Sequence, residues 1–148
     1  MADVNITFED SSGEVLRALE RITAKTLEEL GLTGEAYAKL NCPVGTPEST
    51  GVEGYGPGGT LRNSITHASK DGIAYIGTNI YYGGYVELGT GIHADEGKGR
   101  KTPWIWYDKN GKPHKTDGMK PRHFLKKAVQ DHQKEYKAII ESNFKNNG

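Results

Sequence analysis

The sequence predicts an α+β fold, in which an antiparallel sheet of hairpins packs against two long helices and long glycine-rich loops join the elements. Two stretches with apolar residues at helical spacing, about residues 12–41 and 122–144, predict the helices. Short strand patterns separated by turn signals lie between them. Because the strands are grouped between the helices, the helices are expected to cover one face of the sheet.

A short strand and a capped helix start are predicted at the beginning of the chain. Residues 3–8 alternate between polar and apolar types, as in a half-buried strand. One face of this strand would carry Val4, Ile6 and Phe8. Ser11 stands three residues before Glu14, which is the spacing of a capping box that satisfies free amide groups at a helix start.

The first helix is predicted from one apolar stripe at three- and four-residue steps. The stripe consists of Val15, Leu19, Ile22, Leu30, Tyr37 and Leu40. Gly31 and Gly34 lie within this stretch, and each lowers the stability of a helix by about 1 kcal/mol relative to alanine. The stripe keeps its register across both glycines, so one long helix is expected, ending before Pro43.

Two hairpins are predicted in the middle of the chain. Residues 61–68 read as a strand, 70–72 as a tight turn and 73–78 as the return strand. Residues 80–86 fit either a helical turn or an irregular strand. The second hairpin, residues 104–108 and 113–115, closes around Asn-Gly, the strongest short hairpin signal.

Two loops, about residues 43–60 and 91–103, complete a single domain that covers residues 1–148. The first is so rich in glycine and proline that no regular element is expected there. Loops of this length in a domain of this size are functional or become ordered against a partner.

Composition narrows the class of function. The 148 residues include 19 basic and 19 acidic side chains, so the zero net charge lacks the basic excess typical of nucleic-acid or anionic-membrane binding. The basic residues gather in the C-terminal third and the acidic ones in the N-terminal half, which suits head-to-tail packing of copies or an ordinary solvated surface. The single cysteine, Cys42, excludes an internal disulfide and a cysteine-based zinc site. No stretch approaches the roughly 20 apolar residues of a membrane span.

No catalytic, cofactor-binding or metal-binding residue is assigned from motifs. The spaced glycines of residues 54–59 lack the preceding strand and the later acidic residue of a dinucleotide site. His93 and Asp95 could share a small metal site, but helical histidine pairs at a four-residue step are missing. Ser49, Ser64 and Cys42 stand outside any nucleophile motif.

Two features suggest an interface. Trp104 and Trp106 would face the same side of a strand, beside Arg100, and could form a core, a subunit interface or a stacking platform for single-stranded bases. Glu87 lies between apolar neighbours and would need a partner, for which Arg62 or Arg122 is the expected salt-bridge donor.

Three blocks of sequence, in this order, are similar to a known family. They are Leu61-Arg-Asn-Ser-Ile, Tyr82-Gly-Gly-Tyr-Val-Glu-Leu-Gly-Thr-Gly and Pro121-Arg-His-Phe-Leu-Lys-Lys-Ala-Val. Together with the long first helix and Pro43-Val44, they resemble the head–tail joining or tail-completion proteins of long-tailed phages and prophages. Gly83 stands where the family commonly has alanine, Leu88 where it has an aromatic residue and His123 where it has proline, and residues 52–60 are extra.

The resemblance implies a virion component that is not an enzyme and needs no cofactor. It implies rings or necks built with copies of the chain and with phage connector or tail-terminator and tail-tube proteins, formed in the host cytoplasm and then part of the virion. DNA would pass through the ring without specific binding. The expected interface or fold-specifying residues are Arg62, Tyr82, Tyr85, Glu87, Gly89, Thr90, Trp104, Trp106, Arg122 and Phe124. The alternatives are a nucleic-acid-binding module that uses Trp104, Trp106 and the basic C-terminal third, and a small hydrolase or nuclease that uses histidines and Asp95.

Overall fold

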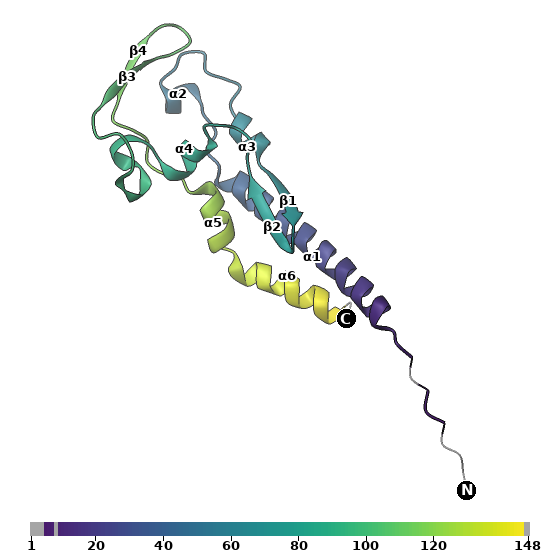
Figure 1. Ribbon diagram of the computed structural model, residues 1–148. Helices are drawn as coiled ribbons and strands as arrows, with labels where there is room; N and C mark the ends of the chain where they lie inside the picture. The colour runs from purple at the N-terminus through teal and green to yellow at the C-terminus, as the bar shows by residue number, and fades with distance from the viewer. Residues whose placement is uncertain (1–4, 8, 147–148) are drawn as a thin grey trace.

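The computed structural model describes residues 5–7 and 9–146 and has a mixed helix and strand architecture. The first helix, α1 (Ser12–Asn41), forms the long axis of the molecule (Figure 1). A hairpin of two strands, β1 (Thr66–Lys70) and β2 (Ile73–Gly77), packs along one side of α1. Two further helices, α5 (Phe124–Gln130) and α6 (Gln133–Asn146), contact α1 beside the hairpin.

The start of α1 is capped differently from the sequence prediction. The carboxylate of Asp10 accepts a hydrogen bond from the Ser12 amide at 2.9 Å, whereas the Ser11 side chain makes no capping hydrogen bond. The predicted capping box is therefore wrong, because a neighbouring carboxylate satisfies the helix start instead. At the other end, Cys42 has extended backbone angles before Pro43, as expected of a residue that precedes proline.

Gly31 and Gly34 lie where the β1–β2 hairpin crosses α1. A Cβ atom on Gly31 would stand 2.6 Å from the His67 ring, and one on Gly34 would stand 3.1 Å from Ile76 Cγ2. His67 and Ile76 are cross-strand partners in the hairpin. The two glycines therefore cost helix propensity but allow the hairpin to approach the helix backbone closely.

The strands form two separate two-stranded sheets, so the prediction of one sheet of hairpins is wrong. β1 pairs with β2, and β3 (Trp104–Tyr107) pairs with β4 (Pro113–Thr116), both antiparallel. The first hairpin packs on α1. The second is held at its tip by the loop of residues 43–60, since Lys109 and Asn110 donate to the carbonyls of Gly54 and Glu53. Each hairpin thus has its own support.

Several segments predicted as strand or loop contain short helices. Residues predicted to open the first hairpin form α3 (Thr60–Ser64). The segment left open between helix and strand is helical, α4 (Gly83–Leu88). The loop of residues 43–60 contains α2 (Pro47–Thr50), whose start has a capping box between Thr46 and Ser49.

The second predicted loop and the first predicted strand also differ from expectation. Residues 91–103 contain two short 3-10 helices, η1 (Gly91–His93) and η2 (Asp95–Gly97). The strand expected at residues 3–8 lies largely outside the described residues, and the described residues 5–7 have no regular structure.

The C-terminal helix is broken, which corrects the prediction of one helix over 122–144. A turn at residues 131–132 separates α5 from α6 (Figure 1). The ring of His132 stacks on that of Tyr37 with centroids 3.4 Å apart, and the Tyr136 hydroxyl donates to the Ala128 carbonyl at 2.5 Å. These contacts favour the turn over a continuous helix. Further along α6, Asn143 donates to Thr26 Oγ1 at 3.1 Å.

The core is small and lies where the end of α1, α3 and α5 meet. Its buried members are Ala38, Cys42, Leu61, Ile65, Phe124 and Ala128. Among the described residues, Phe124 and Ile65 are the largest side chains that are fully buried. The first turns of α1 remain exposed, with Leu16 at 59% and Val15 at 55%.

The β1–β2 hairpin is also attached to α1 by a histidine between two glutamates. His67 Nδ1 lies 2.5 Å from Glu35 Oε2, and its Nε2 lies 2.9 Å from Glu28 Oε1. Glu35 also accepts from Lys39 at 2.6 Å. A neutral imidazole has one N–H and can donate to one of the two carboxylates, whereas a protonated one donates to both. The attachment is therefore complete only with charged His67.

We expect the stability of the protein to fall as the pH rises from about 6 to 8.5. Hydrogen bonds to Glu35 and then Glu28 raise the pKa of His67, so its contribution is fully present below the ordinary value of about 6.5 and is lost as pH rises through the raised pKa. Hydrogen bonds from Lys39 and then His67 lower the pKa of Glu35, so its contribution is lost only at acid pH, as pH falls through that lowered value.

Thermal unfolding of the wild type and of His67→Gln across this pH range measures the effect. The variant should show a weaker fall in melting temperature between pH 6 and 8.5, since a glutamine side chain does not titrate. Parallel curves for the two proteins would contradict the role assigned to His67.

Candidate functional site

The three sequence blocks that carry the family resemblance meet in space, although they are far apart in the chain. Leu61 from α3 and Phe124 from α5 belong to the same buried cluster, and Tyr82 and Val86 pack against it. The Arg122 amide donates to the Val86 carbonyl at 2.9 Å. We call this meeting point of residues 61–65, 82–91 and 121–129 the three-block junction.

Glu87 joins two blocks of the junction, but not through arginine. Its carboxylate accepts hydrogen bonds from the amides of Leu125 and Lys126, both at 2.9 Å. The salt bridge expected with Arg62 or Arg122 is absent from the described part of the chain, where both arginines are exposed. Glu87 instead caps the start of α5, where His123 supplies no capping side chain and the free amides need an acceptor.

The Gly89-Thr90-Gly91 segment crosses the backbone of residues 117–119 at close range. The Thr90 amide donates to the Met119 carbonyl at 2.9 Å, and Thr90 Oγ1 accepts from the Met119 amide at the same distance. Gly91 has φ +63°, and a Cβ atom there would stand 1.9 Å from the Asp117 carbonyl oxygen. Gly89 and Thr90 are therefore part of a fold-specifying backbone crossing.

An exposed aromatic surface surrounds α4. Tyr82 packs edge-on against Tyr81 and is half-buried, whereas Tyr81 is 86% exposed and Tyr85 is 59% exposed. A hollow of 770 Å³ opens between α4 and residues 94–104. The Arg100 guanidinium lies 5.5 Å from the centre of the Trp104 ring at this hollow.

The two tryptophans do not form a shared platform of free ring faces. Trp106 stacks on His114 of the paired strand with ring centres 4.5 Å apart. The Arg100 guanidinium lies over the ring of Trp104. His114 Nε2 in turn lies 2.7 Å from Asp108, whose carboxylate also accepts the amides of Asn110 and Lys112. Trp106 therefore contributes to the rigidity of the second hairpin.

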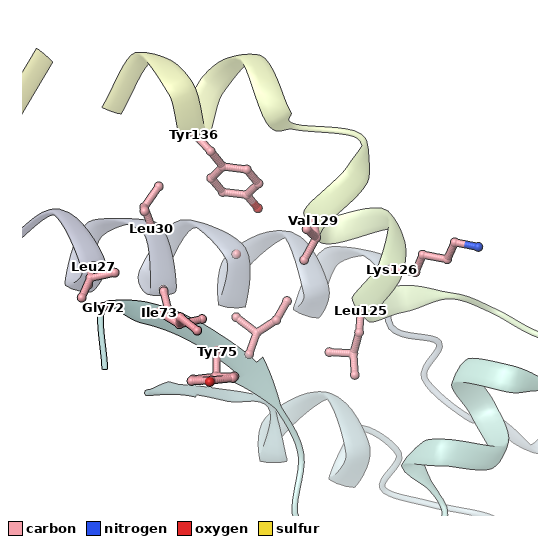
Figure 2. Close-up of a pocket in the computed structure, with 13 residues that line it drawn as sticks. Leu27, Leu30, Gly72, Ile73, Tyr75, Leu125, Lys126, Val129 and Tyr136 are labelled. Carbon is pink, nitrogen blue, oxygen red and sulfur yellow. The ribbon is translucent and has the colours of Figure 1, made fainter. Parts of the chain in front are cut away.

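A second hollow, of 610 Å³, runs between β2, α1 and the α5–α6 pair (Figure 2). Leu27 and Leu30 from α1, Ile73 from β2, and Leu125 and Val129 from α5 line it. We call this hollow the β2 groove. Sequence reasoning missed it, although Gly31 and Gly34 in the middle of a helix indicated a close approach by another element.

His93, His114 and His123 each pair with one carboxylate, and His67 lies between two. His93 and Asp95, which were considered as a shared metal site, have different partners: His93 lies 3.7 Å from Asp117, and Asp95 lies 3.4 Å from His123. Within residues 5–7 and 9–146, no group of three or more potential metal ligands occurs. Burial raises the pKa of the Cys42 thiol, which keeps it protonated and poorly nucleophilic.

Comparison with protein-family models, curated proteins and solved structures gave no match to this chain. None of the described helices is both long and apolar enough to cross a membrane.

Proposed function

We propose that this chain is a structural virion subunit of a long-tailed phage or prophage, which acts in head–tail joining or tail completion. It would assemble into a ring or neck with copies of itself and with connector or tail-terminator and tail-tube proteins, and would carry out no reaction. It would be made in the host cytoplasm and end at the head–tail junction or in the tail. The phage assignment rests on the sequence resemblance.

The proposed assembly role rests on one observation: the described residues bury a small core and leave many large apolar side chains exposed. Among the described residues, Phe124 and Ile65 are the largest side chains that are fully buried. Large apolar side chains remain exposed on several elements, among them Leu16, Tyr75, Tyr85 and Val129. Exposed apolar surface of this extent is typical of protein that completes its burial against neighbours.

The three-block junction supports the resemblance itself. Residues that match the family pattern, such as Leu61, Glu87 and Phe124, contact or enclose one another although they come from distant parts of the sequence. The junction gives such a subunit a rigid centre, from which loops and exposed faces can reach its neighbours.

A nucleic-acid-binding module has less support. Its proposed stacking platform is partly occupied, because one face of Trp106 is stacked on His114. The net charge of zero supplies no general attraction to phosphate.

The test is to measure the mass of the full chain by light scattering over a dilution series, alone and mixed with connector and tail-terminator proteins encoded beside it. We expect concentration-dependent association into closed rings, visible by negative-stain electron microscopy, or a stable complex with one of the neighbours. A monomer that joins neither itself nor these proteins would overturn the proposal. Salt-sensitive binding of single-stranded DNA by such a monomer would favour the nucleic-acid alternative.

A further inference from the structure

The β2 groove follows the free edge of a strand. Every residue from Gly72 to Ile76 lines it, although successive side chains of a strand point to opposite faces. A hollow that touches all of them must run along the edge of the strand rather than over one face. Within the described residues β2 pairs with β1 alone, so its other edge presents unpaired backbone groups to the groove.

The walls of the groove suit an added strand better than a small ligand. Its lining is mainly aliphatic, with Leu27 and Leu30 from α1 and Leu125 and Val129 from α5 (Figure 2). The Tyr136 hydroxyl, one of the few polar groups at the groove, already donates to the Ala128 carbonyl. A small-molecule site needs polar groups that fix orientation. An extended segment would instead hydrogen-bond the β2 edge and place alternate side chains on the aliphatic floor.

We propose that residues 3–8 of a second copy of this chain add to the β2 edge as a third strand. This segment has the alternation that such a strand requires, with Val4, Ile6 and Phe8 on one face. Ile6 is 71% exposed in the single chain. Six residues span about 20 Å as a strand, which matches the five residues of β2. This inference names a contact through which copies would assemble, and it rests on the proposed function, in which the chain assembles with copies of itself.

In its own chain, Ile6 cannot lie beside Ile76, which contacts α1 at Gly34. The hairpin meets α1 at Gly31 and Gly34, where His67 and Ile76 are the nearest side chains. Gly31 lies nineteen residues beyond Ser12, a rise of about 28 Å along the helix. Ile6 is six residues before Ser12, and a fully extended chain covers about 20–22 Å over that distance. An Ile6 side chain that lies beside Ile76 therefore belongs to another copy.

The charges at the two surfaces are complementary. Asp3, Glu9 and Asp10 flank the apolar residues of the segment. Lys126 lies on the wall of the groove, and Lys70 lies beside the hairpin turn. Because donor and acceptor are different surfaces, the contact is head-to-tail and generates a ring when the rotation between copies closes. Each copy would give its first residues to one neighbour and receive those of the other.

Disulfide trapping in the full chain tests the contact. The Cys42→Ala background removes the single thiol. One preparation carries Ile6→Cys, and a second carries Ala74→Cys or Ile76→Cys, which lie on the face of β2 toward the floor. After mixing and mild oxidation, we expect a 6–74 or 6–76 disulfide between chains, identified by mass spectrometry, with a yield that rises with concentration. Thr7→Cys, on the opposite face of the segment, is the matched control and should link several-fold less.

A charge on the donor strand gives an independent measurement. Ile6→Asp should raise the dissociation constant for self-association at least tenfold, whereas Thr7→Asp adds the same charge on the solvent side and should change it less than threefold. Circular dichroism of both variants checks that each is folded. Equal effects of the two variants, or the failure of both acceptor cysteines to link, would overturn the strand exchange. Rings that persist in Ile6→Asp would overturn this inference alone, whereas a wild type that never associates would overturn the assembly proposal as well.

Discussion

Replacing Phe124 with alanine should lower the free energy of unfolding by about 3–5 kcal/mol, the usual cost of deleting a fully buried phenylalanine. Phe124 is 0% exposed and is the largest side chain of a core that has few other large members among the described residues. It also holds the three blocks of the junction together, because Leu61, Val86 and Ala128 pack around it. Little of the marginal stability of a small domain would remain.

Urea unfolding followed by circular dichroism measures this loss, with Phe144→Ala as the matched control. Phe144 lies near the end of α6 and is 38% exposed, so its truncation should cost less than about 1 kcal/mol. In the proposed assembly, the Phe124→Ala variant should also lose ring formation. Similar midpoints for the two variants would show that the core is not centred on Phe124.

Gly91→Ala should destabilise the protein by about 3 kcal/mol, from two causes that add. The residue has φ +63°, which costs a non-glycine residue roughly 1–2 kcal/mol. Its Cβ would also stand 1.9 Å from the Asp117 carbonyl oxygen, which belongs to the backbone and cannot rotate away. Overpacking of this kind typically costs about 1–3 kcal/mol.

Gly111→Ala separates the two causes. Gly111 has φ +75°, but no atom lies within 4 Å of where its Cβ would be. It therefore has the conformational cost without the collision and should lose only about 1–2 kcal/mol. Thermal unfolding of the two variants side by side should place Gly91→Ala clearly lower. Equal losses would mean that residues 90–92 and 117–119 can move apart freely.

Local signals predicted most of the regular elements. The apolar stripe and Pro43 indicated the bounds of α1, and Asn110-Gly111 indicated the turn of the second hairpin. The first hairpin turn was also correct, although its first strand begins later because residues 60–64 are helical. These features depend on residues close in sequence, such as turn glycines and helical spacing, so sequence alone is informative about them.

The contacts within the candidate site were harder to predict from the sequence. Glu87 stood out as a carboxylate among apolar neighbours and does have partners, but they are the amides of Leu125 and Lys126 rather than an arginine. Every residue type except proline has a backbone amide, so the sequence does not show which amides a carboxylate will accept from. The helix cap formed by Glu87 could therefore not be distinguished from a salt bridge. His93 and Asp95, considered as a small metal site and not assigned, likewise have partners that are distant in sequence.

The sequence by itself determined the extent of the long first helix and the positions of the two hairpin turns, because helical spacing and turn residues act over a few positions. The tertiary structure alone decided that the hairpins form two separate sheets, that the last helix breaks at residues 131–132, and that β2 keeps a free edge beside an apolar groove. Each of these depends on contacts between residues far apart in the chain, such as Tyr37 with His132 and Gly34 with Ile76. Such contacts are set by the packing of whole elements, which no local pattern encodes.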